Sequence, residues 1–299
     1  MTINDIARMA GVSKTTVSRV LNNTGYVNQE TRDNISRIIE ETNYFPSATA
    51  VNLSKRESTT IGVVVPEIDN SFFAEILQGI TEVCDKNDLS MLCCDTQNNA
   101  EKEARALRML SQQRVRGVII TPAITYTDPQ ASRTFKKLLS SLNVPVVMVD
   151  RELEGAQWDG VYYENFQSAY QATVELIKSG HRRIGILTGD LQLKLGQDRF
   201  KGFLQAMEDH DLPVAEKDIL RGDFTTDTAY RMAPISLHVE ELDILDYHFS
   251  CVTRDTHGMG RTAMNLLLER FEQPDRQRSN IMVPFEVVLK GSEKIGDSR

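Results

Sequence analysis

The first twenty-three residues of this chain constrain its fold more than any other segment. Thr2 and Asp5 have the spacing of a capping box at the start of a helix. Gly11 stands where such a helix would end in a sharp turn. Apolar residues recur at the i, i+3, i+4, i+7 spacing of a helix with one buried face, at Ile3, Ile6, Ala7 and Ala10. The segment therefore predicts a short amphipathic helix followed by a tight turn.

A second helix is predicted directly after this turn, with Ser13 as its cap and Val17, Val20 and Leu21 buried. Two helices around a short glycine-containing turn form a helix-turn-helix, whose second helix reads base edges in the major groove. The exposed face of this one carries hydrogen-bonding side chains, namely Lys14, Thr15, Thr16, Ser18, Arg19 and Asn22. An ordinary amphipathic helix pair is the alternative, but the side chains of this face favour DNA.

A third helix is predicted over residues 29–43, with Asn28 as its cap. Its isoleucines would share a small core with the first two helices, and Pro46 would end the unit. Residues 1–46 are therefore expected to form an all-α DNA-binding domain. Its predicted DNA-contacting residues are Thr2, Ser13, Lys14, Thr15, Thr16, Ser18, Arg19 and Asn22.

Three stretches of this domain, residues 5–7, 10–13 and 16–22, resemble the opening of the lactose-repressor/galactose-repressor family of bacterial transcription regulators. The resemblance implies a repressor of carbohydrate-related genes that binds double-stranded operator DNA as a homodimer. It also implies control by a small-molecule effector, a sugar or sugar derivative.

Residues 47–60 are predicted to link this domain to the rest of the chain. A plain flexible tether is one interpretation, because a helix this short is marginal alone. The resemblance favours a hinge helix that orders on DNA and inserts Leu53 between bases in the minor groove.

The charge of the chain is unevenly distributed. The net charge is −8, yet residues 1–60 hold seven basic and six acidic side chains. The acidic surface therefore belongs to the remainder of the chain, away from phosphate, and non-specific affinity for DNA should be modest. The four cysteines lack metal-ligand spacing and predict free thiols. With no signal segment and no apolar run near ~20 residues, a cytoplasmic protein without a membrane partner is expected.

Residues 61–293 alternate between strand-like and helical patterns, which predicts parallel sheets covered by helices. Strands are expected at 61–65, 89–94, 117–121, 145–149 and 183–188, and helices at 72–85, 100–113, 130–141, 166–178 and 197–210. Ligands of such sheets bind outside the carboxyl ends of the strands. Residues 294–299 are a polar tail.

This part of the chain contains no phosphate-binding loop, dinucleotide fingerprint or nucleophile elbow, so neither an enzyme nor a bound cofactor is predicted. Its five histidines also lack the spacing of metal ligands. An enzyme on this sheet is therefore the weakest interpretation.

The core also resembles the lactose-repressor/galactose-repressor family, whose regulatory part has two subdomains and resembles periplasmic sugar-binding proteins. Matching stretches include 61–66, 117–120 and 180–185. The resemblance implies that Phe73 packs on the effector and that Arg199 hydrogen-bonds it. Without it, Phe73 is equally a core aromatic and Arg199 a surface charge. The full set of predicted effector-binding residues is Phe72, Phe73, Asp150 and Arg199.

The chain departs from the family pattern after Met232, because residues 233–241 are too few for the strand, helix and strand expected there. The second subdomain is therefore predicted to be incomplete. A natural self-contained variant and an internal deletion are both compatible with this. The competing function is a cytoplasmic sugar-binding protein, or a defective regulator that has lost its effector response.

Overall fold

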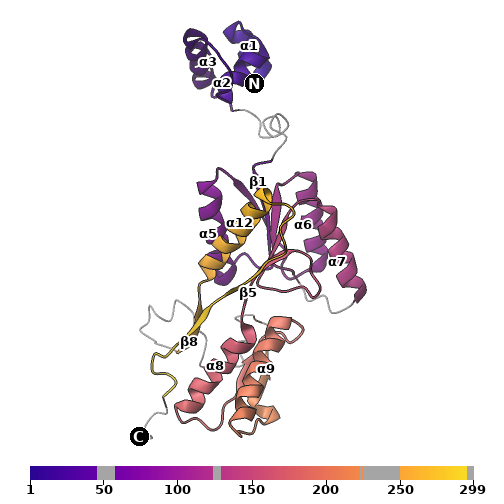
Figure 1. The fold of residues 1–299 in the computed structure, drawn as a ribbon, viewed down its shortest axis with the longest axis vertical. Helices are drawn as coiled ribbons and strands as arrows, with labels where there is room; N and C mark the ends of the chain where they lie inside the picture. Colours follow the sequence, from indigo (N-terminus) through magenta and orange to yellow (C-terminus); the bar gives the residue numbers. More distant parts are fainter. Residues whose placement is uncertain (46–57, 124–128, 223, 225–249, 295–299) are drawn as a thin grey trace. The chain divides into compact units, whose positions relative to one another are not determined.

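The computed structural model describes residues 1–45, 58–123, 129–222, 224 and 250–294. The chain divides into two compact units, Met1–Ser58 and Thr59–Arg299, and each is described by itself (Figure 1). The division falls inside the linker predicted at 47–60. Leu53 and the shortened segment at 233–241 lie outside the described residues.

The N-terminal unit is the predicted three-helix domain. Its helices are α1 (Ile3–Ala10), α2 (Lys14–Leu21) and α3 (Gln29–Thr42). Thr2 and Asp5 form the predicted capping box, and Gly11 ends α1 with a left-handed backbone at φ 66°. A separate small core holds the helices together and consists of Ile6, Ala7, Val17, Ile35, Ile38 and Tyr44. The sequence predicts these three helices to within a residue at each end.

The larger unit is built around a six-stranded parallel sheet of order β2-β1-β3-β4-β5-β9. Its strands are β1 (Thr60–Val65), β2 (Ser90–Asp95), β3 (Gly117–Ile120), β4 (Val146–Val149), β5 (Asp159–Tyr163) and β9 (Asn280–Val283). The last strand comes from near the C-terminus and adds to the edge formed by β5. The strands therefore follow one another in the sheet in a different order from that in the sequence.

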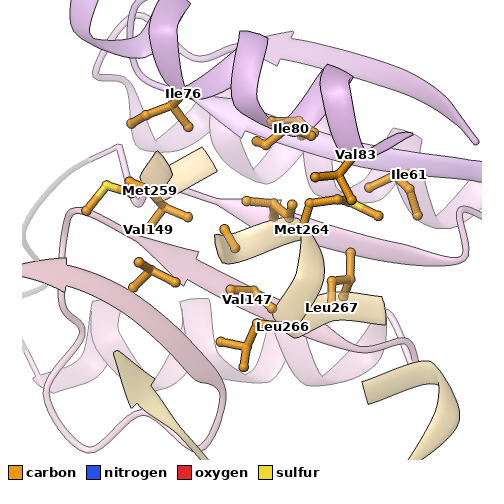
Figure 2. Packing of buried hydrophobic residues seen from close by; sticks show 14 of the residues in the cluster. Ile61, Ile76, Ile80, Val83, Val147, Val149, Met259, Met264, Leu266 and Leu267 are labelled. Atoms are coloured by element: carbon orange, nitrogen blue, oxygen red, sulfur yellow. The ribbon is translucent and has the colours of Figure 1, made fainter. Parts of the chain in front are cut away.

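Helices cover both faces of this sheet (Figure 1). Helices α5 (Ser71–Lys86) and α12 (Thr256–Glu272) pack on one face, and α6 (Ala100–Gln112) and α7 (Pro129–Ser141) on the other. Successive strand residues point to opposite faces, so Val63 and Val65 join the first cluster and Val64 the second. Figure 2 shows Ile76 and Ile80 of α5 facing Met264 of α12 across the first cluster.

Two glycines let α5 and α12 approach closely. A Cβ atom at Gly79 would lie 2.0 Å from the carbonyl oxygen of His257. A Cβ atom at Gly260 would lie 2.1 Å from the carbonyl oxygen of Ile76. Both obstacles are backbone atoms of the facing helix, so no side-chain rotation could make room. A helix from the C-terminal part of the chain is thereby fixed onto one from the N-terminal part.

The remaining elements of this unit lie outside the six-stranded sheet, in the region where the second subdomain is predicted. They are α8 (Asn165–Lys178), β6 (Ile186–Thr188), α9 (Lys194–Asp209), a 3-10 turn (Glu216–Asp218), β7 (Ile219–Arg221), β8 (Cys251–Arg254) and β10 (Phe285–Val288). Strands β6 and β7 pair in parallel, and β8 pairs with β10 in antiparallel fashion. Within the described residues, these strands therefore form two separate two-stranded sheets.

The structure corrects three details of the prediction. The strand expected at 183–188 begins only at Ile186, and α9 begins at Lys194 rather than residue 197. Strands β5, β7, β8, β9 and β10 were not predicted, because each is short and contains polar residues or glycine. All four cysteines are free, as predicted. No helix among the described residues is long and apolar enough to cross a membrane.

Candidate DNA-binding face and effector cleft

Helix α2 is fixed at its start by Ser13. The Ser13 hydroxyl accepts a hydrogen bond from the Thr16 amide at 3.1 Å, and the two hydroxyls lie 2.9 Å apart. Val17 is fully buried one residue later. The cap and the buried valine together set which face of α2 is left exposed.

The eight residues predicted to contact DNA divide into two groups. Thr2 and Ser13 cap helices, Thr16 bonds Ser13, and the Asn22 amide donates to the Ser18 carbonyl at 2.9 Å. In contrast, Lys14, Thr15 and Arg19 are exposed, and their side chains make no hydrogen bond within the part of the chain that the structure describes. These three are therefore the side chains most available to a partner.

Arg19 lies against the loop that follows α2. A Cβ atom at Gly25 would lie 3.4 Å from both Cδ and Nε of Arg19. Gly25 also has a left-handed backbone at φ 65°, which a side chain at this position would strain. The glycine therefore lets the stem of Arg19 rest on the loop while its guanidinium stays exposed.

A second group of polar side chains gathers at the carboxyl ends of three strands. Asp150 follows β4, Tyr163 ends β5 and Arg254 ends β8. Asp150 is 7% exposed and has a left-handed backbone at φ 63°, which aspartate tolerates better than most residues. Burial raises the pKa of its carboxyl group, while Arg151, Arg199 and Arg254 act in the opposite direction. We define this region by Asp150, Tyr163, Arg199, Phe224 and Arg254 and call it the effector cleft, a name for a candidate site.

Arg199 reaches this cleft from α9. Its Nε donates to Oδ1 of Asn165 at 2.8 Å, and its guanidinium lies 5.6 Å from the centre of the Phe224 ring. Phe224 in turn covers Gly189, where a Cβ atom would lie only 1.8 Å from the ring. Burial, followed by the nearby charge of Arg254, lowers the pKa of Arg199 to about 9, so the guanidinium remains charged at neutral pH. The side chain is therefore held by one hydrogen bond and one ring contact.

The two predicted phenylalanines have different environments. Phe73 is 4% exposed and belongs to the cluster under α5 and α12, so the structure gives it a packing role. Phe72 is half-buried, with its ring centre 5.0 Å from that of Phe73 and 6.2 Å from that of Tyr163. An effector role for either phenylalanine stays a prediction, and Phe72 is the one next to Tyr163 of the cleft.

A cavity of about 360 Å³ adjoins the cleft. Of the four predicted effector residues, Asp150 alone is in its lining, beside Tyr163 and Asn165. Phe72, Phe73 and Arg199 are not part of this lining. No group of three His, Cys, Asp or Glu side chains in the described ranges could hold a metal ion.

Three residues of the cleft were missing from the sequence-based prediction: Tyr163, Phe224 and Arg254. Tyr163 and Arg254 end strands, so the rule that placed Asp150 at a strand end would have found both had β5 and β8 been recognised. Arg254 packs its guanidinium 4.8 Å from the centre of the Tyr163 ring. No local pattern marks Phe224, whose place depends on tertiary packing over Gly189.

Comparisons with known proteins agree with this architecture. Residues 2–47 match the model of bacterial regulatory proteins of the lacI family, and residues 58–240 match that of periplasmic binding proteins and the sugar binding domain of the LacI family. The lac repressor dimer bound to operator and an anti-inducer superposes with a TM-score of 0.84 at 20% identity, over 99% of both chains.

Two relatives carry the name HTH-type transcriptional repressor PurR. The one from Actinobacillus pleuropneumoniae serotype 3 is 33% identical over 298 residues, covering 100% of this chain and 82% of its own length. The one from Haemophilus influenzae strain PittEE is 31% identical over 338 positions, covering 98% of both. Those 338 positions exceed the 299 residues of this chain, so this relative has segments without a counterpart here. The chain belongs to the lacI family of bacterial regulatory proteins.

Proposed function

We propose that this protein represses transcription by binding a two-fold symmetric operator as a homodimer, under the control of a small effector of the sugar class. The observation that carries the proposal is the exposed face of α2, on which Lys14, Thr15 and Arg19 have no competing partner in the described structure. One recognition helix covers only a few base pairs, so two heads on two half-sites supply the specificity.

Arg19 provides the direct test. A guanidinium that bonds one guanine contributes about 1–3 kcal/mol of discrimination, so Arg19→Ala should weaken binding to the preferred site by about 10–100-fold. The preferred site is first selected from a random duplex library with the full chain. Affinities for that site and its single-base variants are then measured by fluorescence anisotropy at fixed salt.

The matched control for Arg19 is Arg37→Ala, which removes the same charge from α3, where Arg37 pairs with Glu41 at 2.9 Å. This control should bind the selected site normally. If Arg19→Ala loses the same affinity for every base variant, Arg19 contacts phosphate and is not a specificity residue. If the library yields no preferred sequence, the alternative of a sugar-binding protein with an inactive head is favoured instead.

Leu53 lies outside the described residues, and its role as a minor-groove wedge stays a prediction from the sequence. Unstacking one base step costs a few kcal/mol and permits a kinked site that meets more protein. Leu53→Ala should therefore leave folding intact but reduce operator affinity by about tenfold or more. It should also reduce the bend measured by circular-permutation gel shift, and an unchanged bend would contradict the wedge.

The shortened segment after Met232 bears on effector control. The extra positions in the Haemophilus influenzae relative support a missing strand-helix-strand unit. The residues of the effector cleft nevertheless lie on both sides of this segment and are brought together in the structure, namely Asp150, Tyr163, Arg199, Phe224 and Arg254. We therefore favour a regulator that still binds effector over one that has lost the response.

A further inference from the structure

Two arginines enter the effector cleft from different elements and stack on aromatic rings. Arg199 lies over Phe224 and Arg254 lies over Tyr163, with guanidinium-to-ring distances of 5.6 Å and 4.8 Å. Stacking uses the flat face of a guanidinium and leaves the N–H groups at its edge free to donate. The ring contacts thus help to hold both side chains without using their N–H donors.

Few of those donors are satisfied. The Nε of Arg199 bonds Asn165, and we find no other hydrogen bond from either guanidinium to a described residue. Asp150 lies close enough to influence the charge of both arginines, yet its carboxylate makes no hydrogen bond with either. Within the described residues, the polar groups of the cleft with unused hydrogen-bonding positions are therefore two cations and one carboxylate.

Three neighbouring charged groups form hydrogen bonds elsewhere. Asp255 accepts a hydrogen bond from the Gly258 amide at 2.6 Å, and Asp190 accepts one from the Gln192 amide at 2.8 Å. The guanidinium of Arg151 donates to the backbone oxygens of residues 122 and 123. Within the described residues, none of these groups forms a hydrogen bond or an ion pair with Arg199 or Arg254.

A bound molecule would have to match this unpaired set. Two guanidiniums are satisfied best by anionic oxygens, which form shorter and stronger hydrogen bonds than neutral ones. A carboxylate accepts only, so Asp150 requires donors such as hydroxyl groups. The rings of Phe72 and Tyr163 offer an apolar surface for the C–H groups of a carbon chain.

Building on the effector-controlled regulator proposed above, we infer that the effector is an anionic sugar derivative, with a phosphate or carboxylate group between Arg199 and Arg254 and hydroxyl groups on Asp150. A neutral sugar would leave Arg199 under the repulsion of Arg254, with Asp150 as the carboxylate that acts on both. An anionic group removes that repulsion, which is why the charged derivative should bind more tightly than its neutral parent.

Calorimetric titration of the full chain tests this inference with three matched panels. The panels are the neutral sugars glucose, galactose, fructose and ribose, their terminal phosphates, and the corresponding sugar acids, with inorganic phosphate as a separate arm. At least one phosphate or acid should bind at least tenfold more tightly than its neutral parent. The panel that contains it identifies the anionic group.

Variants then assign the charge preference to the cleft. Arg254→Gln should weaken the charged ligand by about 10–100-fold and reduce its advantage over the neutral parent, because a hydrogen bond to a charged group is lost. Arg254→Lys keeps the charge without the planar fork and should retain part of the preference. Arg108→Gln removes an exposed charge on α6 and should change nothing. Circular dichroism verifies that each variant is folded.

The remaining outcomes separate this inference from the proposed function. A neutral sugar that binds as tightly as its phosphate and acid would overturn the anionic effector but leave effector control intact. Inorganic phosphate that binds as tightly as a sugar phosphate would show an anion site alone and would also overturn it. Binding by no member of any panel would contradict effector control itself, while operator selection through α2 would be unaffected.

Discussion

Replacing Arg270 with alanine should lower the free energy of unfolding of the core by about 3 kcal/mol, the lower end of the cost of breaking a buried ion pair, because Asp159 would keep the Ser279 amide at 2.7 Å and Arg276 at 4.0 Å. Asp159 is 1% exposed, and Arg270 bonds it through Nε at 2.9 Å and Nη2 at 2.8 Å. The same guanidinium donates to the carbonyl oxygens of Pro274 and Gln277. One side chain thus ties the start of β5 to the end of α12 and the loop before β9.

Urea unfolding followed by the fluorescence of Trp158, the single tryptophan, measures the loss from Arg270→Ala. Arg108→Ala is the surface control and should stay within about 0.5 kcal/mol of the native chain. The double variant Asp159→Asn with Arg270→Ala should recover part of the loss, because it removes the charge of a buried carboxylate that has lost its main partner. A loss below about 1 kcal/mol in Arg270→Ala would show that the pair contributes little.

Placing leucine at Gly260 should destabilise the core by about 3 kcal/mol or more, at the upper end of the cost of overpacking. The added atoms would meet the carbonyl oxygen of Ile76, a backbone atom that cannot turn away. Helices α5 and α12 would have to separate and expose the cluster around Ile80 and Met264.

Alanine at Gly260 gives a sharper test of the same contact. Its higher helix propensity alone would stabilise α12 by about 1 kcal/mol, so a loss of stability must come from the close contact. We expect Gly260→Ala to destabilise the core nonetheless, since its Cβ would also lie 2.1 Å from that oxygen. Arg261→Leu, at the exposed neighbouring position, is the control and should be nearly neutral. A stabilising Gly260→Ala would mean that the two helices separate without cost.

Local patterns in the sequence were sufficient for the head and for most of the first sheet. The three helices carry their own caps and apolar periodicity, and strands β1 to β4 are continuous apolar runs between amphipathic helices. Strand β5 contains Asp159 and Gly160, which a strand pattern discourages. They are accommodated by partners remote in sequence: Arg270 pairs with Asp159, and the side chain of Tyr162 folds over Gly160.

The sequence also predicted only part of the effector cleft. Asp150 was found because it follows a recognisable strand, and Arg199 because a family resemblance covers its helix. Arg254 was missed because its strand pairs with β10, more than thirty residues later, which no local pattern reveals. Phe73 has the sequence environment of a binding residue, yet its side chain is directed into the core by the start of α5. Sequence separation between partners, rather than residue type, therefore limits such predictions.

The late arrival of α12 and β9 sets an order of events during translation, when domains generally fold from the N-terminus onward. The head closes its core with residues 3–44, so it is complete while most of the protein is still unmade. The six-stranded sheet can be completed only after residues 256–283 are synthesised, because these residues cover one of its faces and extend one of its edges. A message truncated before residue 256 therefore specifies a finished DNA-reading head attached to a regulatory half that lacks the helix needed to close it.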